Sequence, residues 1–246
     1  MELTLLYRDD HLVAIDKPAG VLVHRTSMSH DRQFVLQRLR DQLDRWVYPV
    51  HRLDRATSGV LLLALDPHTA GLLGKAFREG RVNKRYLALV RGWTEPEGVI
   101  ERPVYDAGKK QKKPALTRYR RLATVELPVA VDRYPTSRYS LVEVYPQTGR
   151  YQQIRQHFKQ ISHPLIGDTT WGNGRHNRFF RDRFGIHRLM LHAASLDFNH
   201  PHTDRPVHVQ APLDDQWRNL LQALGMPCPE PVGGSWLLPR PASPVM

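Results

Sequence analysis

The longest uninterrupted apolar run of the central part of the chain, Val60 to Leu65, stands between Gly59 and Asp66. A short apolar run with such boundaries predicts a strand that is buried on both faces. Further strands are predicted at Leu3 to Arg8, Leu12 to Asp16, Arg85 to Arg91 and Met190 to Phe198. A sheet is therefore expected at the centre of the fold.

Other segments repeat apolar residues at intervals of three and four, which predicts helices with one buried face. The first such helix is predicted from Phe34 to Val47, with Trp46 as the last of its periodic apolar positions. The pair Asp66-Pro67 is typical of a helix start, with a capping carboxylate before a proline in the first turn. The helical segments and their apolar positions are Phe34 to Val47 (Leu36, Leu39, Leu43, Trp46), Pro67 to Gly80 (Leu72, Leu73, Ala76, Phe77), Arg150 to Ser162 (Tyr151, Ile154, Phe158, Ile161) and Leu213 to Leu224.

The 246 residues carry 36 basic and 24 acidic side chains, a formal net charge of +12. This excess predicts an anionic partner, and nucleic acid is favoured over a membrane because no basic amphipathic helix with exposed aromatics or lipidation motif is present. The single Cys228 excludes an internal disulfide. The thirteen histidines show no HExxH or similarly tight spacing, so no metal site is predicted. Without a targeting or membrane-spanning segment, the protein is expected in the cytoplasm.

One carboxylate stands among cations just before the apolar run, in the segment HRLDRATSG that begins at His51. Asp54 lies between Arg52 and Arg55, and nearby positive charge favours the ionised form of an acid. An ionised carboxylate at the mouth of a rigid strand suits a nucleophile or a base. From the residues alone, a simple ion pair with an arginine remains the alternative.

This segment resembles the active-site motif of the ribosomal large subunit pseudouridine synthase A family. Further matching motifs follow the family's order: KPAGVLVH (17–24), KRYLALVRG (84–92), TGRYQQIRQH (148–157), HPLIGDTTWG and RLMLHAASLDF. The resemblance implies an α+β pseudouridine synthase fold, with a mixed, mostly antiparallel sheet, flanking helices and a central basic cleft. We assign residues 1–225 to one catalytic domain and 226–246 to a proline-rich tail. Gln152 departs from the family, which often has histidine there.

The same resemblance implies an isomerase that converts uridine to pseudouridine in RNA without a cofactor or metal. Its catalytic residue would be Asp54, with Arg155 as the ion partner of that carboxylate and Tyr86 beside the uracil. Arg52 would help to fill the space that the extruded nucleotide leaves. The residues alone also allow Tyr86 to be a half-buried packing residue of its strand and Arg155 to face solvent.

Two basic segments are candidates for RNA contact. The first lies beside a predicted strand, has no acidic residue between Gly108 and Arg121, and is expected to present cations to phosphates in a hairpin. The second, Gly172 to Met190, mixes arginines with phenylalanines that suit base stacking, although a solvated loop anchored by its two phenylalanines is equally compatible. The candidate RNA-binding residues are Lys109, Lys110, Lys112, Lys113, Arg175, Arg178, Arg181 and Arg183.

The segment from Leu122 to Tyr145 resembles the tRNA-specific C-type branch of the family, which implies uridine 65 in the T stem as target. A uridine of large-subunit rRNA is the close alternative because the catalytic motifs are shared. A non-catalytic RNA-binding protein or chaperone with the same fold is an alternative of another class. A hydrolase that uses Asp54 with His51 or His157 ranks last because no GxSxG motif is present. We expect a monomer without a protein partner.

Overall fold

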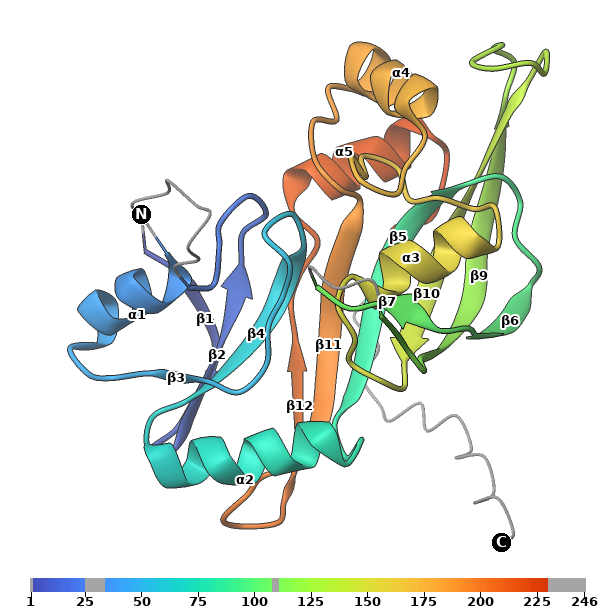
Figure 1. Cartoon of the computed structure of the whole chain (residues 1–246). Helices are drawn as coiled ribbons and strands as arrows, with labels where there is room; N and C mark the ends of the chain where they lie inside the picture. Colours follow the sequence, from blue (N-terminus) through green and yellow to red (C-terminus); the bar gives the residue numbers. More distant parts are fainter. Residues whose placement is uncertain (1, 25–33, 108–110, 230–246) are drawn as a thin grey trace, which may run out of the picture.

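The structure, a computed structural model, describes residues 2–24, 34–107 and 111–229. Within these residues ten strands form one twisted sheet in the order β1-β2-β4-β11-β5-β10-β9-β6, with β3 added to β4 and β12 to β11 (Figure 1). Every pairing is antiparallel except β4 with β11, which confirms a mixed, mostly antiparallel sheet. The strands are β1 (Thr4–Arg8), β2 (Leu12–Lys17), β3 (Tyr48–Pro49), β4 (Ser58–Ala64), β5 (Asn83–Arg91), β6 (Glu97–Glu101), β9 (Leu116–Leu127), β10 (Ser137–Pro146), β11 (Leu191–Asn199) and β12 (Pro206–Gln210). A separate hairpin pairs β7 (Val104–Tyr105) with β8 (Lys112–Lys113).

Strand β4 is the predicted central strand, and all seven of its residues are buried. Leu61 and Leu63 point into one apolar cluster, and Val60 and Leu62 into another on the opposite face. This alternation is the period of two that a strand imposes on its side chains. Gly59 has φ +105°, and a Cβ there would lie 2.2 Å from the carbonyl oxygen of Ala193 on β11. Glycine is therefore required where these two strands run parallel.

The helix predicted from Phe34 to Val47 is shorter in the structure. α1 (Val35–Leu43) ends at Asp44, whose backbone is left-handed. The prediction was wrong for Trp46, which is 65% exposed with the Arg40 guanidinium over its ring, whereas Val47 is fully buried. The spacing of Trp46 fitted the helical period by coincidence, and Val47 after the end of the helix packs into the same apolar cluster as Leu39.

The capped helix is confirmed as α2 (Pro67–Arg78), with the Asp66 carboxylate accepting a hydrogen bond from the Thr69 amide. Leu73 and Ala76 are buried beneath it. α2 covers one end of the sheet, and the motif before β4 therefore lies at the other end of that strand (Figure 1). This arrangement separates the start of α2 from the candidate site.

The other helices are α3 (Gln153–Gln160), α4 (Gly174–Phe184) and α5 (Asp215–Ala223). α4 was not predicted: the segment from Gly172 onward is a helix capped by the Asn173 side chain. Phe180 is fully buried and Phe179 packs against the same core cluster. The expectation of stacking phenylalanines was therefore wrong, since these rings hold α4 on the sheet.

The boundary expected at residue 225 stays a prediction. Met226, the first residue of the expected tail, is buried beside Leu221 of α5, while residues 230–246 lie outside the described part. Across the described residues, no helix is long and apolar enough to cross a membrane.

Candidate active site

The loop before β4 holds Asp54 at the end of the sheet opposite α2. Its carbonyl oxygen accepts a hydrogen bond from the Thr57 amide, and the neighbouring Leu53 side chain is buried in the core. The Asp54 side chain itself keeps 24% exposure. The carboxylate is thus fixed in position by a short turn yet open to a ligand.

Arg155, near the start of α3, connects this carboxylate to a second one. Its Nη1 donates to Asp54 Oδ2 at 3.1 Å, so the expected ion pair is present. Its Nε and Nη2 form a bidentate pair with Asp168 at 2.7 and 2.8 Å. With 6% exposure, Arg155 does not face solvent. A planar guanidinium held by two bonds on one side presents its remaining nitrogen in a fixed direction.

Asp168 is the residue that sequence reasoning missed. Its side chain is fully buried, and Oδ1 also accepts hydrogen bonds from the amides of Thr170 and Trp171. Burial acts to raise the pKa of Asp168, but the Arg155 guanidinium and these amides outweigh it and hold the pKa below its usual value. The sequence offered one indication of its importance, since Asp168 lies in HPLIGDTTWG, one of the motifs that match the family.

Both carboxylates act on the arginine in return. Burial acts to lower the pKa of Arg155, but the charges and hydrogen bonds of Asp168 and Asp54 raise it above the ordinary value. The arginine therefore stays charged between the two carboxyl groups. Asp168 binds the arginine through two short bonds, so Asp54 is left with the single weaker contact and with free lone pairs.

Tyr86 lies on β5, level with Ala193 of β11 and Val144 of β10. The side chain is half-buried and packs against the apolar clusters on both sides of it. Burial raises the pKa of Tyr86, and the nearby charge of Asp54 raises it further. Both effects keep the phenol protonated.

Lys17 fastens the Asp54 loop to the KPAG segment, a role that sequence reasoning did not assign. The side chain is fully buried, and its ammonium donates to the carbonyl oxygens of Pro18, Val21 and Arg55 at 2.8, 2.8 and 3.2 Å. Burial and the positive charge of Arg188 lower the pKa of Lys17 to about 7.

Arg52 lies in the Asp54 loop, and its side chain is exposed. Exposure is what its predicted contact with RNA requires.

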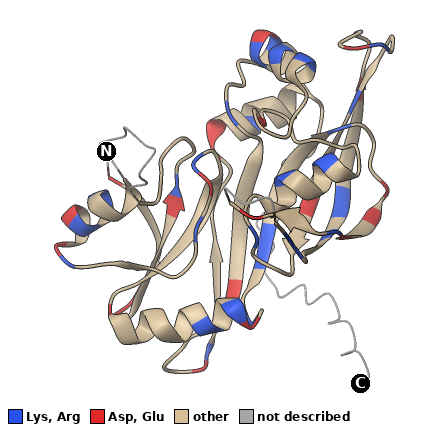
Figure 2. Cartoon of the chain, in the orientation of Figure 1, with Lys and Arg blue, Asp and Glu red and all other residues tan. Residues whose placement is uncertain are grey.

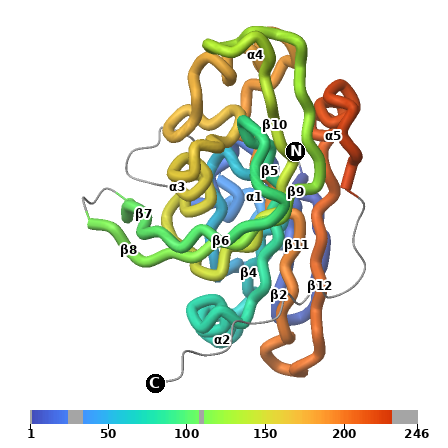
Figure 3. Tube along the Cα trace, turned by 90° about the vertical axis from the view of Figure 1, so that its right-hand side faces the viewer, coloured from blue at the N-terminus to red at the C-terminus, as the bar shows by residue number. Residues whose placement is uncertain are grey.

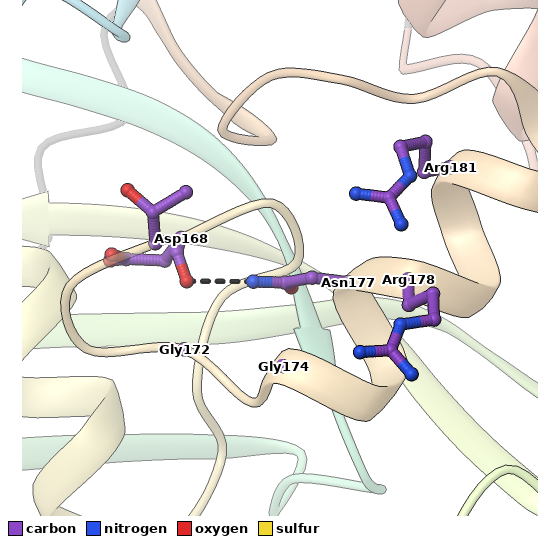
Figure 4. Close-up of a pocket in the computed structure, with 7 residues that line it drawn as sticks. Asp168, Gly172, Gly174, Asn177, Arg178 and Arg181 are labelled. Carbon is purple, nitrogen blue, oxygen red and sulfur yellow. Dashed lines mark hydrogen bonds between the residues drawn. The ribbon is translucent and has the colours of Figure 1, made fainter.

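A cavity of about 290 Å³ opens on the far side of Asp168. Arg178 and Arg181 of α4 face it, and the Asn177 amide donates to the Asp168 carbonyl oxygen at 2.7 Å across its floor (Figure 4). Positions occupied by Lys and Arg, coloured blue in Figure 2, lie along α3, α4 and β9 in this half of the molecule. The cavity therefore lies next to Asp168 and is lined on its other side by two arginines of α4.

The other arginines of α4 differ from these two. Arg175 forms an ion pair with Asp132 of the β9–β10 connection at 2.5 Å, and Arg183 is exposed in the last turn. Arg181 also contacts Asp182 at 3.2 Å, both well exposed. Arg178 and Arg183 have no ion-pair partner among the described residues, and of these two only Arg178 lines the cavity.

The first basic segment is only partly described, because Lys109 and Lys110 lie outside the described residues. The expected hairpin is present as β7–β8, which projects from the body of the chain (Figure 3). Lys113 forms an ion pair with Asp106 at 2.7 Å, so the expectation that the cluster has no local acidic partner was wrong. Lys112 instead lies over the Tyr105 ring.

The histidines of the hydrolase alternative are both occupied elsewhere. His51 Nε2 accepts a hydrogen bond from the Leu62 amide at 2.9 Å. His157 bonds to the Thr117 hydroxyl and the Arg102 carbonyl oxygen at 2.8 Å each. Neither ring is available as the base of a hydrolytic dyad.

Gln152 stands where the family often has histidine. Its side-chain oxygen accepts a hydrogen bond from the Trp171 indole at 2.7 Å.

Comparison with solved structures agrees with the observed architecture. Human RNA Pseudouridylate Synthase Domain Containing 1 is 28% identical, with a TM-score of 0.68 over 93% of this chain and 97% of that one. Human RNA Pseudouridylate Synthase Domain Containing 4 shares the fold with a TM-score of 0.72 over 92% of this chain and 95% of that one, at 24% identity. The α+β sheet with its acid-and-arginine site is thus the pseudouridine synthase fold.

Sequence comparison places the chain within that class. The model of the family described as RNA pseudouridylate synthase matches residues 11–160. The tRNA pseudouridine synthase C of Vibrio cholerae is 46% identical over 91% of this chain and 96% of its own length, and that of Pasteurella multocida is 46% identical over 90% and 96%. The chain belongs to the RNA pseudouridylate synthase family, and it is an isomerase.

Proposed function

We propose that this enzyme converts a uridine of tRNA to pseudouridine, with Asp54 as the catalytic residue and Arg155 as its ion partner. The observation that carries the assignment is the 3.1 Å contact between Arg155 Nη1 and Asp54 Oδ2 in an otherwise buried cluster. Relatives that are 42–46% identical over most of the chain bear the name tRNA pseudouridine synthase C, which supports tRNA as the substrate class.

The reaction breaks the bond between uracil N1 and ribose C1′, rotates the uracil and joins C5 to C1′, with loss of the C5 proton. Asp54 acts on the ribose, as nucleophile at C1′ or as the base that removes a sugar proton. Arg155 directs this carboxylate through a charge-assisted hydrogen bond, and Asp168 holds Arg155. These side chains supply the chemistry without a cofactor.

Tyr86 stacks on the uracil and assists the transfer of the C5 proton. Because burial and the Asp54 charge keep the pKa of its phenol raised, the hydroxyl acts as a hydrogen-bonded relay rather than as a free phenolate.

Tyr86→Phe should therefore reduce the single-turnover rate much more than RNA affinity. The variant keeps the ring that stacks but loses the hydroxyl, so we expect a rate loss of about 10²-fold, within the range for general acid–base catalysis. Filter binding and single-turnover kinetics on the same tRNA measure both quantities. An equal loss in both would contradict the proton-transfer role.

RNA binding requires that the target nucleotide leaves its stem, at a cost of a few kcal/mol. We propose that Arg52 fills the space vacated by this nucleotide. Arg178, Arg181 and Arg183 then contact phosphates near the cavity, and Arg175 contributes less because Asp132 already neutralises it.

Arg178→Gln and Arg175→Gln form a matched pair on one helix. Each phosphate contact releases counterions, so Arg178→Gln should flatten the plot of log affinity against log salt by roughly one unit. Arg175→Gln should change the slope less, since its guanidinium is already paired. Equal slopes for Arg178→Gln and wild type would remove Arg178 from the RNA interface.

The hairpin lysines are proposed as a second phosphate contact. Changing Lys109, Lys110, Lys112 and Lys113 to glutamine should lower the salt slope by at most roughly three units, not four, because Lys113 is paired with Asp106. Turnover at saturating RNA should stay near wild type. An unchanged slope would show that this hairpin does not touch RNA.

We further propose uridine 65 of the T stem as the target, supported by the resemblance of residues 122–145 to the C-type branch. We expect the enzyme to meet this substrate in the cytoplasm and to act as a single chain; both expectations stay predictions.

The test is to incubate the purified chain with a tRNA transcript and, separately, with naked large-subunit rRNA. Pseudouridine is then mapped by carbodiimide adducts that stop reverse transcription. A single stop at position 65 supports the proposal. Preference for rRNA would keep the enzyme class and reject tRNA as the substrate. Absence of any product would favour the non-catalytic RNA-binding alternative.

A further inference from the structure

Three loops meet at the end of the sheet that carries α2, opposite α4 (Figures 1 and 3). They are the β1–β2 turn with His11, the start of α2 with Asp66, and the β11–β12 turn with His202. One ligand atom from each of these residues lies within 4.8 Å of the other two. The residues are far apart along the chain, so spacing in the sequence gave no sign of them.

The distances are close to those of a metal site. A tetrahedral ion with bonds of about 2.0–2.1 Å holds neighbouring ligand atoms ~3.4 Å apart. His11 Nδ1 lies 3.8 Å from Asp66 Oδ2. The rings of His11 and His202 are stacked with centroids 3.9 Å apart, so one ring must turn about its side-chain bonds for both lone pairs to meet at one ion. The His11 and Asp66 side chains are 43% and 36% exposed, so an ion and a coordinating water can reach them and the side chains can move by the remaining ångström.

Hydrogen bonds around the cluster fix the state of His202. The Thr69 hydroxyl lies 2.6 Å from Asp66 Oδ2, which can only accept, so the hydroxyl proton points to Asp66. His202 Nε2, 2.7 Å from the same hydroxyl, must then donate its own proton. When the ring is neutral, its lone pair is therefore on Nδ1, as a metal ligand requires, and its bonded N–H matches the outer contacts of ligating histidines.

A third histidine, His200, lies beside the cluster, with its ring centroid 5.8 Å from that of His202. His200 is itself occupied: its Nε2 lies 3.0 Å from Asp9, and its Nδ1 accepts from the amides of His202 and Thr203 at 3.3 Å. His200 therefore shapes the β11–β12 turn rather than serving as a ligand.

We propose that His11, Asp66 and His202 bind one divalent transition-metal ion, with Zn²⁺ as the ion to test. Two imidazoles and one carboxylate suit Zn²⁺ and its transition-metal neighbours rather than Mg²⁺ or Ca²⁺, which prefer oxygen ligands. The ion would tie together three turns that follow β1, β4 and β11 in one half of the sheet. The site is independent of the reaction, because Asp54 precedes β4 and Asp66 follows it, at opposite ends of a seven-residue strand.

The test uses the full chain without a histidine tag, stripped with a chelator and titrated with Zn²⁺ by calorimetry. We expect one Zn²⁺ per chain with a Kd of 10 µM or tighter, in keeping with a partly exposed three-ligand site, and a melting temperature raised by ~5 °C at one hundred times the Kd. His11→Ala and His202→Ala should each weaken binding at least tenfold. Asp66→Asn should also weaken it while keeping the helix cap, since asparagine caps as well as aspartate.

His208→Ala is the matched control. His208 forms an exposed pair with Asp197 at 2.6 Å in the same pair of strands, without a second histidine ligand. This variant should bind Zn²⁺ within twofold of wild type, and all metal-free variants should melt near the metal-free wild type. A wild-type Kd weaker than 10 µM, or equal binding by wild type, His11→Ala and His202→Ala, would overturn the proposal. Equal loss in His208→Ala would do the same.

Discussion

Asp54→Asn should abolish turnover while leaving RNA affinity within a few fold of wild type. The amide keeps the shape of the side chain but is neither a nucleophile nor a base, so we expect a loss of at least ~10³ in rate, or ~4 kcal/mol of barrier. Affinity should change little because the carboxylate acts on one ribose rather than on the phosphates. Single-turnover kinetics with saturating tRNA and equilibrium binding measure the two effects separately.

The control for this substitution is Asp132→Asn, which removes an acid that pairs only with the surface residue Arg175. It should leave the rate within about twofold of wild type. If Asp54→Asn retained more than a tenth of the wild-type rate, Asp54 would not be the catalytic residue. If it lost RNA affinity in proportion to rate, the carboxylate would serve binding instead.

Arg155→Lys should be nearly as damaging despite the conserved charge. The guanidinium reaches Asp168 with Nε and Nη2 and Asp54 with Nη1, and an ammonium cannot span both carboxylates in this way. We expect kcat to fall by about 10²-fold, equivalent to ~2.7 kcal/mol. Arg150→Lys, an exposed change just before α3, is the matched control and should be nearly neutral.

Asp168→Asn tests the same geometry from the other side. Asparagine can still accept from Thr170 and Trp171, but it leaves the buried Arg155 with one carboxylate instead of two. Because Asp168 holds Arg155 and not the substrate, kcat should fall while KM stays within a few fold. Full activity in Arg155→Lys would contradict the role of Asp168 in positioning Arg155. So would an Asp168→Asn variant in which KM changes and kcat does not.

Strands β1, β2, β4, β5 and β11 and the helices other than α4 could be predicted because local pattern dictates them, whereas the long strands β9 and β10 were not assigned. The apolar run of β4 and the Asp66-Pro67 start of α2 are each specified within a few residues. α4 could not be predicted, since its arginines conceal a short apolar face formed by Phe180 and its neighbours. The exposed Trp46 was misplaced because periodicity does not record where a helix stops.

The site shows the same division between local and distant information. Asp54, Tyr86 and Arg155 were found through motifs that resemble a family, and the structure brings Arg155 to Asp54 over a separation of 101 residues. Asp168 was missed because its importance depends on the tertiary contact with Arg155. Lys113 was taken as uncompensated because Asp106 lies just outside the basic run. Ion pairs made across turns are set by the fold, which composition alone does not reveal.

The most direct test of the central claim is tritium release from tRNA that carries 5-³H-uridine. The C5 hydrogen is displaced only when C5 becomes the carbon joined to the ribose. We predict that the wild-type chain releases one tritium per tRNA in the presence of a chelator and that Asp54→Asn, which still binds this tRNA, releases none above background. Release by Asp54→Asn at the wild-type rate, or no release by wild type, would contradict the account.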